Sequence, residues 1–118
     1  MSDEFLRVAK KEIRDDIAEI GILLQKCSDD GALYKNAVHL EKHIHKIKGL
    51  APMMGNDQIG HVAALVDKLL KTALAGSSIR GIYLATKKSH EFMQNTIDGV
   101  DQDFDLLKNE IEKITNIS

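Results

Sequence analysis

Apolar side chains recur at steps of three and four residues along almost the whole of this 118-residue chain. That spacing gathers them on one face of an α-helix, whereas a half-buried strand needs apolar residues at every second position. The chain contains a single proline and few β-branched runs. It is therefore predicted to be all-α. Its core must be built from aliphatic side chains, because it holds no Trp, three Phe and two Tyr.

Turn-forming residues divide this pattern into four segments. The expected helices cover residues 3–27, 32–55, 57–75 and 79–114. Four amphipathic helices joined by short turns predict an antiparallel up-down bundle, formed by one domain of residues 1–118. Ser77 or Ser78 is expected to cap the last segment, which is long for such a bundle. It is predicted to continue through Gly99 as one helix, straight or mildly kinked there, the alternative being a break at Asp98–Gly99.

Composition narrows the classes of function. A net charge of −2 provides no basic field, so binding to nucleic acid is not expected. No apolar run approaches the roughly 20 residues that span a membrane, and the first residues do not resemble a secretory signal. Cys27 is the single cysteine and cannot form an intramolecular disulfide, which favours a reducing, cytoplasmic setting. We expect a monomer without a cofactor.

Residues 43–55, HIHKIKGLAPMMG, interrupt an otherwise regular helix with a histidine, a Lys–Gly pair and a proline. On this helix the core stripe runs through Ile44 and Ala51, which leaves His45 pointing towards solvent. Gly49, one turn after His45, exposes bare backbone where another protein can approach closely. Two further small or apolar residues lie on the same face: Val38 and Pro52.

The third helix is expected to return antiparallel, which brings position 67 opposite position 45. Asp67 lies on the flank of its core stripe and is predicted to reach the inward-facing nitrogen of His45. The alternative for Asp67 is an ion pair with a lysine four residues later on its own helix. Three residues of this helix extend the same low-relief surface: Gly60, Ala64 and Lys71.

An exposed imidazole whose other nitrogen is hydrogen-bonded to a carboxylate is a good nucleophile near neutral pH. Lys48, three residues after His45, can bring its ammonium close to a group attached to the ring. A phosphoryl group there would carry about two negative charges. The pattern favours a reversible phosphohistidine over hydrolysis, because the sequence shows neither a metal-binding acidic cluster nor a nucleotide-binding loop.

These residues resemble the histidine-containing phosphotransfer domains of bacterial multistep phosphorelays. The family motif is His-x-x-Lys-Gly followed by a further Gly about six residues later, and here it consists of His45, Lys48, Gly49 and Gly55. The family commonly holds the histidine ring with a Gln or Glu, where this chain has the shorter Asp67. In the family, the helix that carries the histidine usually has no proline at the position that corresponds to Pro52.

The resemblance implies a phosphoryl carrier without a kinase module. His45 would accept the group on its outward Nε2 nitrogen from a receiver-domain aspartate, or from a sensor or hybrid histidine kinase. It would then pass the group to the aspartate of a response-regulator receiver domain. Lys48 would stabilise the phosphoryl group, and Asp67 would orient the ring.

Two alternatives remain at this point. The first is a helical adaptor that binds signalling partners through the same face without being phosphorylated. The second is a metal site, suggested by the four-residue spacing of His39 and His43. These two histidines lie on the other flank of the helix from His45, and no nearby acid–histidine pair completes a ligand set. No physiological metal is therefore expected.

Overall fold

The computed structural model describes residues 2–117, and the side chains of residues 2–114. The described residues form no strand. They contain five helices: α1 (Asp3–Gln25), α2 (Asp30–Met53), α3 (Asp57–Leu74), α4 (Ile82–Ile97) and α5 (Phe104–Ile117). The prediction of an all-α bundle is confirmed. The predicted count of four helices is wrong, because the last segment forms two.

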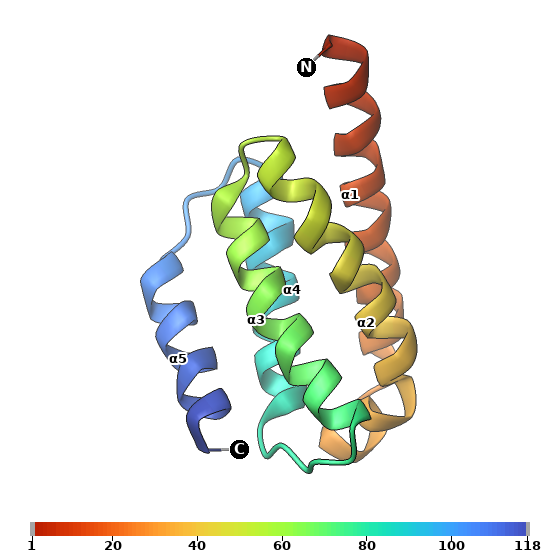
Figure 1. The fold of residues 1–118 in the computed structure, drawn as a ribbon, viewed down its shortest axis with the longest axis vertical. Helices are drawn as coiled ribbons and strands as arrows, with labels where there is room; N and C mark the ends of the chain where they lie inside the picture. Colours follow the sequence, from red (N-terminus) through yellow and green to blue (C-terminus); the bar gives the residue numbers. More distant parts are fainter. Residues whose placement is uncertain (1, 118) are drawn as a thin grey trace.

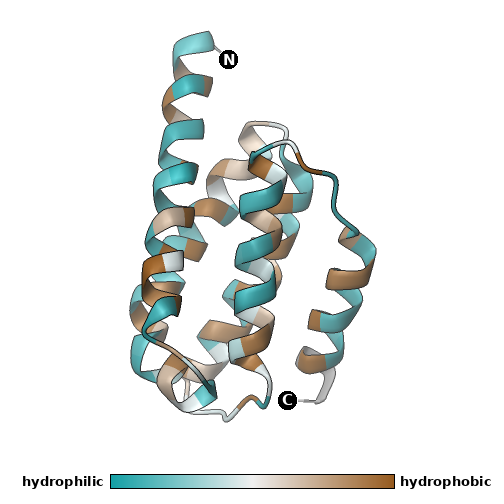
Figure 2. Cartoon of the chain, turned by 180° about the vertical axis from the view of Figure 1, so that it is seen from behind, coloured by the Kyte–Doolittle hydropathy of each residue, from teal (hydrophilic) through white to brown (hydrophobic). Residues whose placement is uncertain are grey.

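Helices α1 to α4 surround one aliphatic core, and α5 lies outside them against α3 and α4 (Figure 1). Each helix runs opposite to the one before it, and the first turns of α1 project beyond its neighbours. Apolar residues lie mainly on the faces turned towards other helices, while the projecting turns of α1 are mostly hydrophilic (Figure 2). Helix α2 lies between α1 and α3, so each of its two flanks borders a different helix.

The predicted continuous last helix is wrong, and the chain breaks at the position given as the alternative. Gly99 has a φ of +83°, a conformation that glycine adopts without steric cost. The amides of Gly99 and Val100 donate to the carbonyls of Thr96 and Asn95, at 3.0 and 2.9 Å. These two bonds form a Schellman motif, which ends α4. The chain then turns back, and α5 begins at Phe104.

The start of α4 is capped from another helix. Its N-cap residue, Gly81, has no side chain to accept a hydrogen bond. The carboxylate of Asp30, in the first turn of α2, accepts instead from the amides of Gly81 and Tyr83 at 2.9 and 2.8 Å. The expectation that Ser77 or Ser78 caps this helix is therefore wrong, because a long-range contact supplies the cap.

Pro52 has a structural role at the end of α2. A Cβ atom added to Gly60 of α3 would come within 2.7 Å of the Pro52 Cγ, so this close approach of the two helices requires a glycine. Gly60 is buried, which contradicts its predicted place on the exposed face. Gly55, with a φ of +79°, ends the helix one turn later. The pair of α2 and α3 is thereby fixed just beyond His45.

Candidate functional site

His45 lies in the middle of α2, and its side chain is 58% exposed. Its neighbours Ile44 and Ile47 are fully buried, so the helix is held in register by the core while His45 faces outward. The solvent-facing position predicted from the helical period is therefore confirmed.

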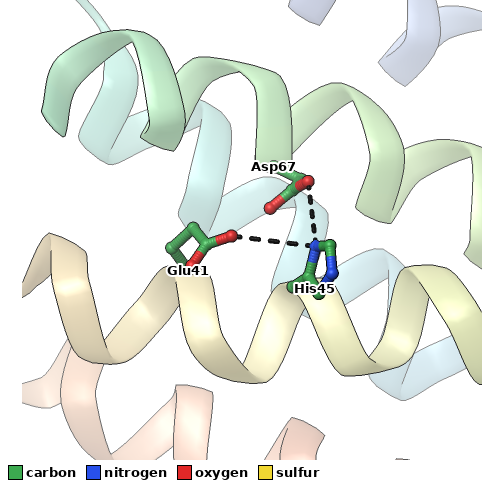
Figure 3. A group of neighbouring side chains, drawn as sticks. All are labelled: Glu41, His45 and Asp67. Carbon is green, nitrogen blue, oxygen red and sulfur yellow. Dashed lines mark hydrogen bonds and ion pairs between the residues drawn. The ribbon is translucent and has the colours of Figure 1, made fainter. Parts of the chain in front are cut away.

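The carboxylate of Asp67 on α3 lies against the inner side of the ring. Its Oδ2 lies 3.4 Å from the Nδ1 of His45, and its side chain is only 2% exposed. The second ring nitrogen points away from the carboxylates (Figure 3). The predicted approach of Asp67 to the inward nitrogen is present in the structure, although Asp67 is more deeply buried than the flank position suggested. Nε2 is left available for an incoming group.

Two lysines share the same carboxylate oxygen. The Nζ atoms of Lys71 and Lys48 lie 2.9 and 3.3 Å from Asp67 Oδ2. The Lys71 Nζ also lies 3.4 Å from the Nδ1 of His45. Both lysine side chains are about half exposed, at 50% and 41%. Each ammonium is therefore accessible to an anion outside the protein.

The contacts of Lys71 and Asp67 bear on the tautomer of His45. Nδ1 can donate to the carboxylate or accept from the ammonium, and the two heavy-atom distances are equal at 3.4 Å. Lys71 already donates to Asp67 at 2.9 Å, a shorter and charge-assisted contact. The carboxylate therefore accepts a hydrogen bond from the Nδ1–H group, and the lone pair of the neutral ring lies on Nε2.

The pKa of Asp67 lies below its usual value. Burial has the largest single effect and would raise this pKa, but the hydrogen bonds from Lys71 and three other neighbours outweigh it. Burial, and then the hydrogen bond to Asp67, raise the pKa of the Glu41 carboxyl. Of the two adjacent carboxyl groups, Asp67 is the one that ionises first on raising the pH.

Glu41 is a member of the site that sequence reasoning did not include. Its Oε1 lies 3.8 Å from His45 Nδ1 and 3.8 Å from Lys71 Nζ. Glu41 precedes His45 by four residues, which places both on one face of a helix. That spacing was a sufficient signal, since Glu41 is the only carboxylate one turn from His45 on its own helix.

Comparison with known proteins identifies the family. A model of the Hpt domain matches residues 4–116, nearly the whole chain. This chain belongs to the Hpt domain family. Neither the curated proteins nor the solved structures that were compared match it. The family assignment places this Hpt domain in phosphorelay, two-component signalling, as a histidine phosphotransfer protein, and confirms the resemblance seen in the sequence. None of its described helices is long and apolar enough to cross a membrane.

The surface around His45 of this Hpt domain is open. A Cβ atom added to Gly49 would meet no atom within 4 Å, and Val38 is 63% exposed. Pro52 is also exposed, and Ala64 of α3 is half-buried. Of the residues expected to form a low-relief face, Gly60 alone is buried. The remaining residues of that face, with Lys71, are exposed or half-buried on α2 and α3.

Three groups of this Hpt domain have a spacing compatible with a metal ion. Glu41, His45 and Asp67 each place one ligand atom within 4.8 Å of the others. The ammonium groups of Lys48 and Lys71 already lie against the Asp67 oxygen, so a cation would have to displace them. The protein's own lysines therefore balance this negative charge, and the site suits an anion next to His45 better than a metal ion.

Proposed function

We propose that His45 is the phosphoacceptor through which this Hpt domain carries a phosphoryl group between receiver domains. The single observation that supports this most directly is the orientation of the ring. Its Nδ1 faces a buried carboxylate at 3.4 Å, while 58% of the side chain is exposed. Such a ring presents a nucleophilic Nε2 to a partner protein.

The proposed transfer is a displacement at phosphorus. The Nε2 lone pair of His45 attacks the phosphoryl group of a receiver aspartyl phosphate, and an N–P bond forms. The P–O bond to the aspartate breaks, and that carboxylate leaves with the bonding electrons. The Nδ1 proton stays directed at Asp67, which stabilises the positive charge that develops on the ring. Passing the group to another receiver aspartate reverses these steps.

Lys48 and Lys71 supply the countercharge in this proposal. An ammonium about 4 Å from a unit negative charge gains about 4 kcal/mol at an effective dielectric near 20, and less where water screens it. Since both side chains are about half exposed, they can turn from Asp67 towards the phosphoryl oxygens. The phosphohistidine is thereby stabilised enough to form, yet remains accessible for transfer.

The partners proposed are receiver domains and a sensor or hybrid histidine kinase. They would dock over Gly49 and the neighbouring residues Val38, Pro52, Ala64 and Lys71. Their approach is supported by the open space above Gly49. We propose that the carrier acts as a cytoplasmic monomer, depends on a kinase elsewhere for its phosphoryl group, and needs no cofactor.

The test is transfer from a phosphorylated receiver domain to the wild-type chain and to His45→Gln. The proposal expects label on the wild type, none on the variant, and an acid-labile, alkali-stable phosphoamide. His39→Gln is the matched control, because His39 is an exposed histidine of the same helix with no bonded partner among the described residues. Binding of the receiver without any transfer would instead support the unphosphorylated adaptor.

A further inference from the structure

A second cluster of histidine, aspartate and lysine lies on the opposite flank of α2. The Nδ1 of His43 lies 2.9 Å from Oδ1 of Asp16 on α1. The Nζ of Lys46 lies 3.3 Å from the other oxygen of the same carboxylate. Asp16 is 3% exposed, as buried as a core residue. This cluster has no part in the function proposed for His45.

The two clusters have the same construction. In each, a histidine of α2 is followed three residues later by a lysine, and both contact one buried aspartate of a neighbouring helix. The aspartate comes from α3 in the His45 cluster and from α1 in the His43 cluster (Figure 1). The repeated His-x-x-Lys spacing within HIHKIK produces both, because positions 43 and 45 point to different sides of one helix.

The bonding of His43 leaves one ring nitrogen free. Its Nδ1 is engaged by a carboxylate at 2.9 Å, which fixes that nitrogen as the donor and leaves the lone pair of the neutral ring on Nε2. Nε2 has no hydrogen-bond partner in the described part of the chain. The side chain is 25% exposed, enough for a small molecule to reach the ring edge.

We propose that His43 is a second phosphoryl acceptor, which takes the group from a small phosphoryl donor such as an acyl phosphate or a phosphoramidate. A docked receiver domain is not its donor. The ring is less than half as exposed as that of His45 and lies between α1 and α2. The residue four positions on, which is Gly49 for His45, is here the buried Ile47. No bare backbone beside His43 allows a domain to approach closely.

The step is balanced within these groups. The Nε2 lone pair of His43 attacks phosphorus, an N–P bond forms, and the bond from phosphorus to the acyl oxygen or to the amide nitrogen breaks. The leaving carboxylate departs as the anion, or the leaving amine takes a proton from water. The Nδ1 proton remains on the ring, directed at Asp16, and Lys46 is the nearest cation on that carboxylate.

The experiment uses His45→Gln, so that the first site is silent. The full chain is incubated with phosphoramidate, and phosphorylated peptides are mapped by mass spectrometry at alkaline pH. We expect label at His43, about tenfold above that at His39, because a charge-assisted hydrogen bond holds only the former ring. A phosphorylated receiver should give His45→Gln no label. Equal label at His39 and His43, or none at His43, would overturn the proposal, as would transfer from the receiver to His43.

Asp16→Asn tests the positioning role of the carboxylate. It should lower phosphoramidate labelling at His43 about tenfold while leaving that at His45 unchanged, a difference that general unfolding cannot produce. Labelling at His43 that is independent of Asp16 in the folded variant counts against the mechanism. If the variant does not fold, the labelling map of His45→Gln decides alone. The two proposals fail separately, since receiver transfer tests His45 and phosphoramidate mapping tests His43.

Discussion

Each flank of α2 pairs a histidine, and the lysine three residues later, with a buried aspartate of a neighbouring helix, yet the two flanks differ in access and charge. The His43 ring has the shorter contact to its aspartate, 2.9 Å against 3.4 Å, but is 25% exposed where His45 is 58% exposed. Asp67 contacts two lysines and Asp16 contacts one. On the proposed assignment of His45, an open surface and two neighbouring lysines, rather than a well-held ring alone, distinguish the relay site.

The comparison also separates two tasks of a buried aspartate. Asp16 of α1 is buried and contacts His43 and Lys46 of α2, so it links the two helices. Asp67 does the same for α2 and α3, and in addition contacts two half-exposed ammonium groups. The second arrangement can respond to an incoming phosphoryl group, because the lysines can exchange one anion for another.

The largest effect is expected from Asp67→Asn, with Asp16→Asn as its matched control. Asp67→Asn should slow receiver transfer to His45 at least about tenfold, because the ring loses its charge-assisted partner and the favoured tautomer. Asp16→Asn should leave that rate unchanged. Single-turnover transfer from a labelled receiver measures both. Equal slowing in the two variants would mean that the aspartates act only through the stability of the bundle, which thermal melts of both would show.

A smaller effect on receiver transfer is expected at Gly49, one turn after His45. Gly49→Leu fits the free protein, so it should keep or raise stability by up to about 1 kcal/mol through helix propensity. It should nevertheless slow receiver transfer, because the new side chain occupies the docking surface. Phosphoramidate labelling of His45 should not change. Slowing of both reactions would argue against docking as the cause.

Gly60→Ala tests the close contact between α2 and α3 at Pro52. The added methyl group would lie 2.7 Å from the Pro52 Cγ, so the helices must shift, at a cost of about 1–3 kcal/mol. Urea unfolding measures this cost. A variant as stable as the wild type would show that Pro52 adjusts freely, and would remove the structural explanation for both residues.

Removing one lysine from each cluster tests what its positive charge contributes. Lys48→Ala should slow transfer about threefold to tenfold, since a half-exposed ammonium contributes about 1 kcal/mol to holding the phosphoryl group. The effect should shrink as salt is added. Lys46→Ala, on the other flank, should leave receiver transfer unchanged. A loss of helicity in Lys48→Ala, measured by circular dichroism, would contradict its half-exposed position outside the core.

Sequence reasoning succeeded where one helix or one hairpin determined the result. The outward direction of His45 follows from the helical period, and the approach of Asp67 follows from the reversal of the chain between α2 and α3. It failed where distant contacts decide. The Asp30 cap of α4 and the burial of Gly60 by Pro52 depend on how helices meet, which a pattern along one helix does not contain.

The end of α4 failed for a different reason. The apolar spacing continues through Gly99, so periodicity alone predicted one helix. The positive φ of Gly99 and its Schellman bonds end the helix regardless of that spacing. At the site, the contact of Glu41 with His45 was readable at a spacing of four residues. The pairing of His43 with Asp16 was not, because it joins α1 to α2.

The smallest effect is expected from Glu41, which has no counterpart in the His43 cluster. Burial and the contact with Asp67 raise the pKa of Glu41 in the folded protein. The protonated carboxyl group therefore stabilises the fold fully at pH values below its ordinary pKa, and this stabilisation is lost as the pH rises through the raised pKa. Asp67 acts in the opposite sense, because its lowered pKa means that stability falls as pH drops through that value. Ionised Glu41 is therefore expected to destabilise the bundle slightly at neutral pH.

Glu41→Gln removes that ionisation and keeps a donor for Asp67. The variant should match the wild type at about pH 4 and exceed it by up to about 1 kcal/mol at pH 7, as measured by urea unfolding across this range. Glu19→Gln is the control, since Glu19 is an exposed carboxylate of α1 with no bonded partner among the described residues. Parallel stability curves for Glu41→Gln and the wild type would show that Glu41 does not share its proton with Asp67.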